Sequence, residues 1–273
     1  MDFRPSALNS GGHGNGSSVQ SSPLANSGEL QRDATQSQVV QENLIKTISE
    51  LQSRGGRASF ERQSLAAEWI AERFRKNGLE VRLETYEYDS KVWKNVVATI
   101  KGTKRPEEYL VVMAHLDTIC VDAVDCSPGA DDNGSGVAVL LEVARALRDF
   151  ALEKSVLFCI FSNEETGCIG SRRFVRDARK NGLQILAAIN FDHLGYNPGG
   201  FAWDSFKCQG RLKYAIKAFL TVCRNYWISL FNEKRAIQVA GRSANAGLVQ
   251  TVSSSMSGQP GLQVKSLVKD DCG

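Results

Sequence analysis

Three short apolar runs constrain the fold of this chain more than any other feature of its sequence. They cover residues 109–114 (YLVVMA), 155–161 (SVLFCIF) and 186–191 (LAAINF), and together they are rich in β-branched and aromatic side chains. Such runs, without polar alternation, are typical of strands buried on both faces of a parallel sheet. Helical patterns separate them, so the sequence predicts an α/β fold with parallel central strands.

Further helices and strands are predicted around these three runs. Two helices are predicted at 39–54 and 59–78, followed by an alternating strand at 79–88 that we expect near an edge of the sheet. The segment 136–150 has one apolar stripe and is predicted to be a crossover helix. We therefore expect a three-layer αβα sandwich with a mixed, mostly parallel central sheet. The remaining predicted elements are a strand at 95–102, a helix at 210–227 and a last strand at 262–268.

Composition divides the chain into a polar tail and a folded domain. Residues 1–36 are rich in Ser, Gly, Asn and Gln, with too few apolar side chains to offset the entropy of ordering. We expect a disordered tail there and read His13 as a solvated histidine. Residues 37–273 are expected to form one α/β domain, since 42% hydrophobic and 23% charged residues in the chain allow a sizeable core.

Charge and hydropathy argue against two kinds of partner. A net charge of +3 is too small and dispersed for a nucleic-acid-binding surface, so we expect no nucleic-acid partner. No apolar run approaches the roughly 20 residues that cross a bilayer, and the amino terminus lacks the features of a signal peptide. We expect no transmembrane segment, and either a cytoplasmic protein or a chain that has lost its leader.

The seven cysteines form no metal-binding pattern. None belongs to a C-x-x-C pair, so a cysteine zinc site is not expected. Cys120 and Cys126 could close a short loop in an oxidising compartment, and free thiols are the alternative.

Each apolar run ends in residues that can bind a metal ion. In an open parallel sheet the carboxyl ends of the strands form the ligand crevice, so residues far apart in sequence should meet there. A glycine-rich turn, GADDNGSG at 129–136, adds two aspartates to the same edge. The candidate residues are His115, Asp117, Asp131, Asp132, Glu164, Glu165 and Asp192.

This cluster holds more negative charge than a cleft tolerates without cations. Asp132, Glu164, Glu165 and Asp192 would repel one another strongly if all were ionised. A dinuclear metal centre would remove the repulsion, and imidazole and carboxylate ligands favour zinc, with manganese or cobalt as substitutes. Two ions about 3.5–4 Å apart would make hydroxide available near neutral pH and polarise a peptide carbonyl.

Four motifs, HLD, GADDNGSG, the Glu-Glu pair and a strand ending in FD, resemble peptidase family M28, the zinc aminopeptidases, over residues 37–197. The resemblance implies a peptide or protein substrate, hydrolysis next to a free amino terminus, two zinc ions and a secreted or periplasmic location. By the resemblance, His115 and Asp192 would bind one zinc, Glu165 would bind the second, and Asp132 would bridge both.

The resemblance also implies roles for residues that do not bind metal. Glu164 would be the general base, which takes a proton from the bridging water and passes it to the leaving amine. Asp117 would fix the tautomer of His115 through a hydrogen bond. Asp131 is not expected to be a ligand. His193 stands where the family has an apolar residue, and we expect it to line the wall of the pocket.

One family ligand has no counterpart in this sequence. The family's last metal ligand is a histidine in a Ser-Asp-His segment near the carboxyl end of the domain, whereas this chain has no histidine after residue 193. We expect that the chain stops short of that segment after SLVKDDCG at 266–273, so that the domain is incomplete. Alternatively, GRSANAG at 241–247 is a degenerate copy, with Ala244 and Asn245 at the Asp and His positions. Either way, we expect weaker zinc binding and reduced turnover.

The residues also allow three other interpretations. A catalytically silent binding or scaffold domain would keep the fold, and a glutaminyl-cyclase-like enzyme would keep a single zinc, although the HLD motif argues against that. The glycine-rich turn also fits a calcium-binding EF-hand loop with Glu142 at its twelfth position. However, a strand precedes this turn, and Glu142 falls inside a predicted helix.

Overall fold

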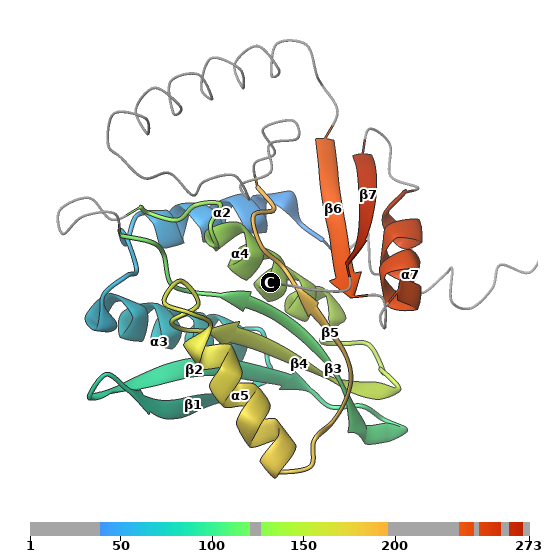
Figure 1. Cartoon of the computed structure of the whole chain (residues 1–273), viewed down its shortest axis with the longest axis horizontal. Helices are drawn as coiled ribbons and strands as arrows, with labels where there is room; N and C mark the ends of the chain where they lie inside the picture. Colours follow the sequence, from blue (N-terminus) through green and yellow to red (C-terminus); the bar gives the residue numbers. More distant parts are fainter. Residues whose placement is uncertain (1–38, 121–126, 196–234, 243–245, 258–261, 270–273) are drawn as a thin grey trace, which may run out of the picture. The chain divides into compact units, whose positions relative to one another are not determined.

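The computed structural model describes residues 39–120, 127–195, 235–242, 246–257 and 262–269 (Figure 1). The chain divides into two units, Met1–Gln38 and Val39–Gly273, and all described residues belong to the second. The helices are α2 (Gln41–Gln52), α3 (Phe60–Lys76), α4 (Gly134–Leu147), α5 (Ile169–Lys180) and α7 (Ala246–Ser257). The strands are β1 (Glu80–Tyr88), β2 (Lys91–Ile100), β3 (Arg105–His115), β4 (Lys154–Phe161), β5 (Gln184–Asn190), β6 (Arg235–Arg242) and β7 (Leu262–Lys269).

The central sheet has the strand order β1-β2-β4-β3-β5. β1 and β2 are antiparallel, as are β2 and β4, whereas β3 runs parallel to both β4 and β5. This confirms the predicted mixed sheet, with the alternating strand β1 at an edge. Because β3, β4 and β5 are parallel, their carboxyl ends lie at one edge of the sheet.

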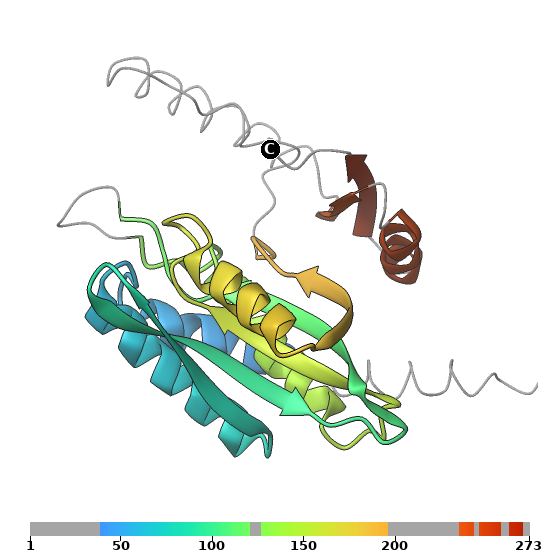
Figure 2. The ribbon, with the colours of Figure 1, turned by 60° about the horizontal axis from the view of Figure 1, so that its bottom comes forward.

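Helices cover both faces of this sheet (Figures 1 and 2). On one face α3 and α4 pack on the strands and α2 packs on α4, enclosing a core in which the rings of Phe74 and Phe158 lie 6.2 Å apart. On the other face α5 closes a smaller cluster, with Phe161 and Phe174 5.4 Å apart. The predicted three-layer αβα arrangement is confirmed.

Local signals explain where α3 begins and ends. The side chain of Ser59 accepts a hydrogen bond from the backbone of Arg62, as an N-cap residue does. The helix ends before Gly78, whose φ of +83° suits the left-handed conformation that follows many helices. The predicted boundary at Asn77-Gly78 is therefore correct.

Burial differs among the three strands that were predicted to be buried on both faces. Residues 155–161 of β4 are all buried, as predicted. In residues 109–114 of β3 only Val111 and Ala114 are buried, and in β5 exposed and half-buried residues alternate. The prediction therefore holds only in part for β3 and is wrong for β5. The reason is its position, because β5 is the last strand in the order of the described sheet.

A second, two-stranded sheet pairs β6 and β7 in parallel, with α7 packed on both strands. β7 matches the predicted last strand, whereas β6, α5 and α7 were not predicted. The predicted tail at 1–36 and helix at 210–227 lie outside the described residues. Within the described ranges, no helix combines the length and apolarity needed to cross a bilayer.

Candidate metal centre

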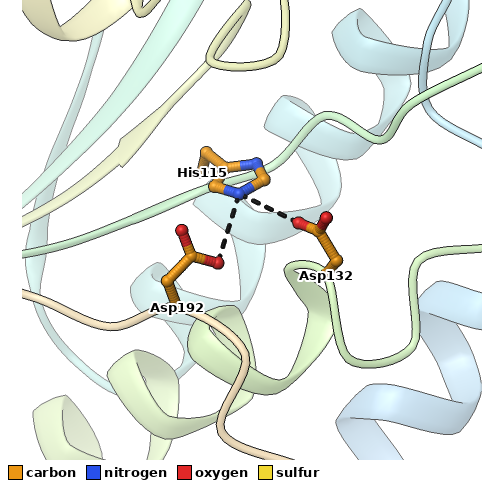
Figure 3. A group of neighbouring side chains, drawn as sticks. All are labelled: His115, Asp132 and Asp192. Carbon is orange, nitrogen blue, oxygen red and sulfur yellow. Dashed lines mark ion pairs between the residues drawn. The ribbon is translucent and has the colours of Figure 1, made fainter. Parts of the chain in front are cut away.

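The candidate site lies where three parallel strands end. His115 is the last residue of β3, Glu164 and Glu165 follow β4, and Asp192 follows β5. Asp132 comes from the turn before α4. Figure 3 shows the carboxylates of Asp132 and Asp192 pointing toward the imidazole of His115. The topology thus brings together residues that are up to 77 positions apart (115 to 192) in the sequence.

The interatomic distances define two overlapping groups. His115 Nε2 lies 3.2 Å from Asp132 Oδ1 and 3.5 Å from Asp192 Oδ1. His115, Glu164 and Glu165 form the second group, in which one ligand atom of each residue lies within 4.8 Å of the others. His115 is therefore shared by both groups.

Two buried carboxylate oxygens in this site are poorly satisfied. Among the described residues, Glu165 Oε1 has no hydrogen-bond partner, and Asp132 Oδ1 has only its contact of 3.2 Å with His115 Nε2. A buried carboxylate oxygen without a partner is energetically costly, and a bound cation removes that cost. These oxygens, together with the imidazole nitrogen of His115, form a donor set that suits zinc.

The acidic surroundings shift the pKa values of the site. Burial alone would lower the pKa of His115, but hydrogen bonds with Asp117, Asp132 and Asp192 outweigh it and raise this pKa to about 12. Burial and the negative charge of Asp132 raise the pKa of Glu165 to about 7. For Asp132, burial is outweighed by contacts with the two histidines, so its pKa lies below the usual range. A metal ion binding here would displace protons.

Asp117 contacts both the histidine and the loop after β4. His115 Nδ1 lies 3.2 Å from the main-chain oxygen of Asp117 and 3.6 Å from its carboxylate. The two carboxylate oxygens accept hydrogen bonds of 3.0 Å from the backbone N–H groups of Glu164 and Glu165. Asp117 therefore holds the Glu-Glu pair in addition to orienting His115.

Asn133 connects the turn before α4 to the end of β5. Its side chain caps α4 by accepting from the backbone of Gly136, and it donates to the carbonyl of Phe191 over 2.8 Å. A Cβ at Gly136 would lie 2.2 Å from Asn133 Oδ1 and 2.7 Å from Phe191 O, so only glycine fits. The peptide bond between Asp132 and Asn133 is cis.

Asp131 does not belong to either metal-binding group. Its Oδ1 accepts hydrogen bonds from the hydroxyl of Ser135 at 3.1 Å and from the backbone of Gly195 at 2.6 Å. This carboxylate therefore holds the loop that follows Asp192, consistent with the expectation that it is not a ligand.

His193 contacts two of the acidic groups in the candidate site. Its Nε2 is 3.2 Å from Asp132 Oδ2, the oxygen that does not face His115, and 3.7 Å from Asp192. The contact with Asp132 raises the pKa of His193 to about 9. No sequence pattern indicated this contact, and His193 adopts a positive φ of 50°.

A buried polar network behind the Glu-Glu pair was also missed. Asn163, with a φ of +55°, donates from its side chain to the hydroxyl of Tyr86 over 2.9 Å. Its backbone N–H donates to Gln63 over 3.2 Å, and the Tyr86 hydroxyl lies 2.8 Å from that of Ser162. The Asn at position 163, directly before the Glu-Glu pair, could have indicated a tight turn there, since Asn tolerates positive φ. No sequence pattern marked Tyr86 or Gln63 as part of this network.

The EF-hand interpretation does not fit the structure. Glu142 accepts hydrogen bonds from the backbone of Val40 and the side chain of Asn43, and it pairs with Arg145 at 2.7 Å. Its carboxylate is thus engaged with α2 and α4 rather than with the glycine-rich turn.

The described cysteines comprise one disulfide-bonded residue and two free thiols. Cys120 is disulfide-bonded, and Cys126, the partner considered for it, lies outside the described residues. Cys159 and Cys168 are free thiols.

Comparison with curated proteins gives named relatives. A protein named "Probable zinc metalloprotease" from Pyrenophora tritici-repentis is 27% identical over 184 residues, 58% of this chain and 42% of that protein. "Probable aminopeptidase YDR415C" from Saccharomyces cerevisiae is 28% identical over 144 residues, 48% of this chain and 38% of that protein. The matched region thus spans about two fifths of the length of these relatives.

Solved structures share the fold. The LapA aminopeptidase of Legionella pneumophila has a TM-score of 0.65 at 17% identity, over 90% of this chain and 59% of LapA. The glutaminyl cyclase of Porphyromonas gingivalis has a TM-score of 0.53 at 26% identity, over 61% of this chain and 65% of the cyclase. The family model of peptidase family M28 matches residues 95–239, more than half of the chain. The chain therefore belongs to peptidase family M28, a family of zinc metallopeptidases.

Proposed function

We propose that this protein is a zinc-dependent aminopeptidase that hydrolyses the peptide bond next to a free amino terminus. The observation that carries the proposal is the convergence of one imidazole and several carboxylates at the ends of three parallel strands, with His115 Nε2 3.2 Å from Asp132. The M28 membership and the relatives' names support the same reaction class.

The geometry suggests how two zinc ions would be held. His115, Asp132 and Asp192 would bind the first. By the family resemblance, Asp132 and Glu165 would bind the second. The two oxygens of Asp132 face different neighbours, His115 and His193, so binding of both oxygens to zinc would replace the contact with His193. Bound zinc would supply Lewis-acid polarisation of the scissile carbonyl and acidify a water molecule.

Glu164 is proposed as the general base. Its carboxylate lies 4.0 Å from His115 Nε2, and 37% of the side chain is exposed, so that it reaches the site from the solvent side. It would take a proton from the attacking water and deliver it to the nitrogen of the leaving amine. Asp117 holds the backbone of Glu164 and so fixes where this carboxylate can move.

The family site has a further histidine ligand for the second zinc. The sequence contains no histidine beyond residue 193, so the family's Ser-Asp-His ligand has no counterpart in it. In the structure, Glu165 groups with His115 and Glu164.

A comparison of free and blocked substrates tests the proposal. Zinc-loaded protein should release nitroaniline from leucine p-nitroanilide and not from its N-acetylated form, and 1,10-phenanthroline should abolish the release. Zinc content is measured by mass spectrometry on the same samples. Equal hydrolysis of the acetylated substrate, or undiminished activity after zinc removal, would exclude a zinc aminopeptidase.

A single-zinc cyclase is the second candidate, favoured by the 26% identity to the Porphyromonas gingivalis glutaminyl cyclase. Such an enzyme would close an amino-terminal glutamine to pyroglutamate and release ammonia. A peptide that begins with glutamine distinguishes the two activities, because only a cyclase converts it without cleaving the chain. A folded, zinc-binding protein inactive in both assays would indicate the scaffold alternative.

A further inference from the structure

Arg57 is the largest side chain that the described structure buries completely, with 1% of its surface exposed. Burying a guanidinium costs several kcal/mol unless its N–H groups are satisfied, so completely buried arginines are rare. The side-chain hydrogen bonds of Arg57 all run to main-chain carbonyls. Such an arginine fixes the backbone around it.

The guanidinium connects two loops. Its Nε donates to the carbonyl of Leu116 over 2.6 Å, in the loop after β3. Its two Nη atoms donate to the carbonyls of Pro128 and Gly129, over 2.8 and 3.0 Å, in the loop before α4. One rigid, planar group therefore sets the distance between segments that are not adjacent in sequence.

Both loops carry proposed metal ligands. Leu116 directly follows His115. The carbonyl of Gly129 also accepts from the backbone of Gly134 over 3.0 Å, which closes the turn that contains Asp132. A shift of the guanidinium would therefore change the separation of His115 and Asp132.

The space around Arg57 is filled. Gly129 has a φ of +59°, and a Cβ there would lie 2.2 Å from Thr118 Cγ2 and 2.8 Å from Arg57 Nη2. The backbone N–H of Arg57 donates to the Thr118 hydroxyl over 2.8 Å. The arginine thus has little freedom to move.

We propose that Arg57 is a positioning residue that clamps these two loops and so sets the spacing of His115 and Asp132 for metal binding. The inference rests on the proposed function, because the spacing matters only if both residues bind one ion. The positive charge of Arg57, taken alone, would weaken metal binding at this site. The guanidinium interacts electrostatically with Asp117 and Asp132, and a positive charge there disfavours a cation.

Zinc affinity and the absorption spectrum of cobalt-loaded protein test the clamp. Arg57→Met removes both the positive charge and the hydrogen bonds to the two loops. Arg57→Lys keeps the charge but cannot reach all three carbonyls. Both variants should bind zinc about 10- to 100-fold more weakly, as expected when a group that supports metal ligands is removed. Both should also change the cobalt spectrum. The control is Arg62→Met, because Arg62 is exposed and donates to the carbonyl of Arg54.

The outcomes separate this inference from the proposed function. Tighter zinc binding by folded Arg57→Met would show that charge dominates and would overturn the clamp. Wild-type affinity and spectrum in both variants would also overturn it. If Arg57→Met does not fold, the zinc affinity and cobalt spectrum of Arg57→Lys test the proposal. Absence of zinc binding in the wild-type protein, or zinc retained by Asp132→Ala, would overturn the proposed function itself.

Discussion

His115 has an environment that favours either a proton or a metal ion. The side chain is 3% exposed and faces three carboxylates from separate loops, Asp117, Asp132 and Asp192. In the metal-free protein, these carboxylates hold a proton on the imidazole. Zinc needs the neutral imidazole, so metal binding and pH are linked at this residue.

This linkage predicts how stability changes with pH. In chelator-treated protein the pKa values of His193, about 9, and of His115, about 12, lie above their ordinary value of 6.5. The stability that their protons contribute is complete below pH 6.5 and is lost as pH rises toward the folded-state values. Zinc replaces these protons and should bind more tightly at higher pH.

The melting temperatures of zinc-loaded and chelator-treated protein should therefore diverge as pH is raised from about 6.5 to about 9. Thermal unfolding followed by circular dichroism measures both forms. A difference in melting temperature that stays constant or narrows over this range would contradict the proton–metal exchange.

Glu164 and Glu165 are adjacent in sequence but should respond differently to mutation. Glu164→Gln should lower kcat by about 100-fold or more, because a general base contributes about 10²–10⁴-fold, and should leave zinc content unchanged. Glu153→Gln, at the amino end of β4, is the control and should change neither quantity. Retained turnover in Glu164→Gln would remove this residue from the proposed role.

At the scale of elements, β1 supports the loop after β4 through a single hydroxyl. Tyr86 is 7% exposed, and its OH contacts Ser162 and accepts from Asn163. Tyr86→Phe removes the acceptor of the Asn163 side-chain amide, whereas the Ser162 hydroxyl keeps its bond to Asn95. The substitution should lower the free energy of unfolding by about 1–3 kcal/mol. Chemical denaturation measures the change. Tyr88→Phe on the same strand should have an effect within about 0.5 kcal/mol, and an equal effect of both would contradict the network.

The packing of α3 on the sheet makes a second prediction at this scale. Phe74 is completely buried and lies against Phe158. Phe74→Ala should reduce the free energy of unfolding by about 3–5 kcal/mol, through lost burial and a remaining cavity. Leu65→Ala, at a position on α3 that is 65% exposed, should change it little. Similar losses for both variants would mean that α3 does not pack as described.

The helix α5, which the sequence analysis did not predict, has few apolar residues. In α5 the buried residues are Gly170, Phe174 and Ala178. Two of these have little or no side chain, so the apolar stripe that marks a helix is narrow. The buried strand β4, in contrast, is a continuous apolar run and was predicted with nearly correct bounds.

For the whole molecule, the sequence predicted the layers and the residues of the candidate site because both depend on local patterns. Apolar runs mark strands, and the parallel order brings their ends together. Arg57 and Gln63, which support the site, were not predictable in this way. Arg57 bonds to carbonyls 59 to 72 positions away, and Gln63 contacts a residue 100 positions away. Such contacts exist only after the layers have packed.

Anomalous X-ray diffraction at the zinc edge, on crystals of zinc-loaded protein, tests the shared metal site most directly. The strongest peak should lie within about 2.0–2.2 Å of His115 Nε2 and of carboxylate oxygens from Asp132 and Asp192. It should disappear in crystals of Asp132→Ala. A zinc ion bound elsewhere, with His115 and Asp132 still contacting each other directly, would contradict the proposed centre.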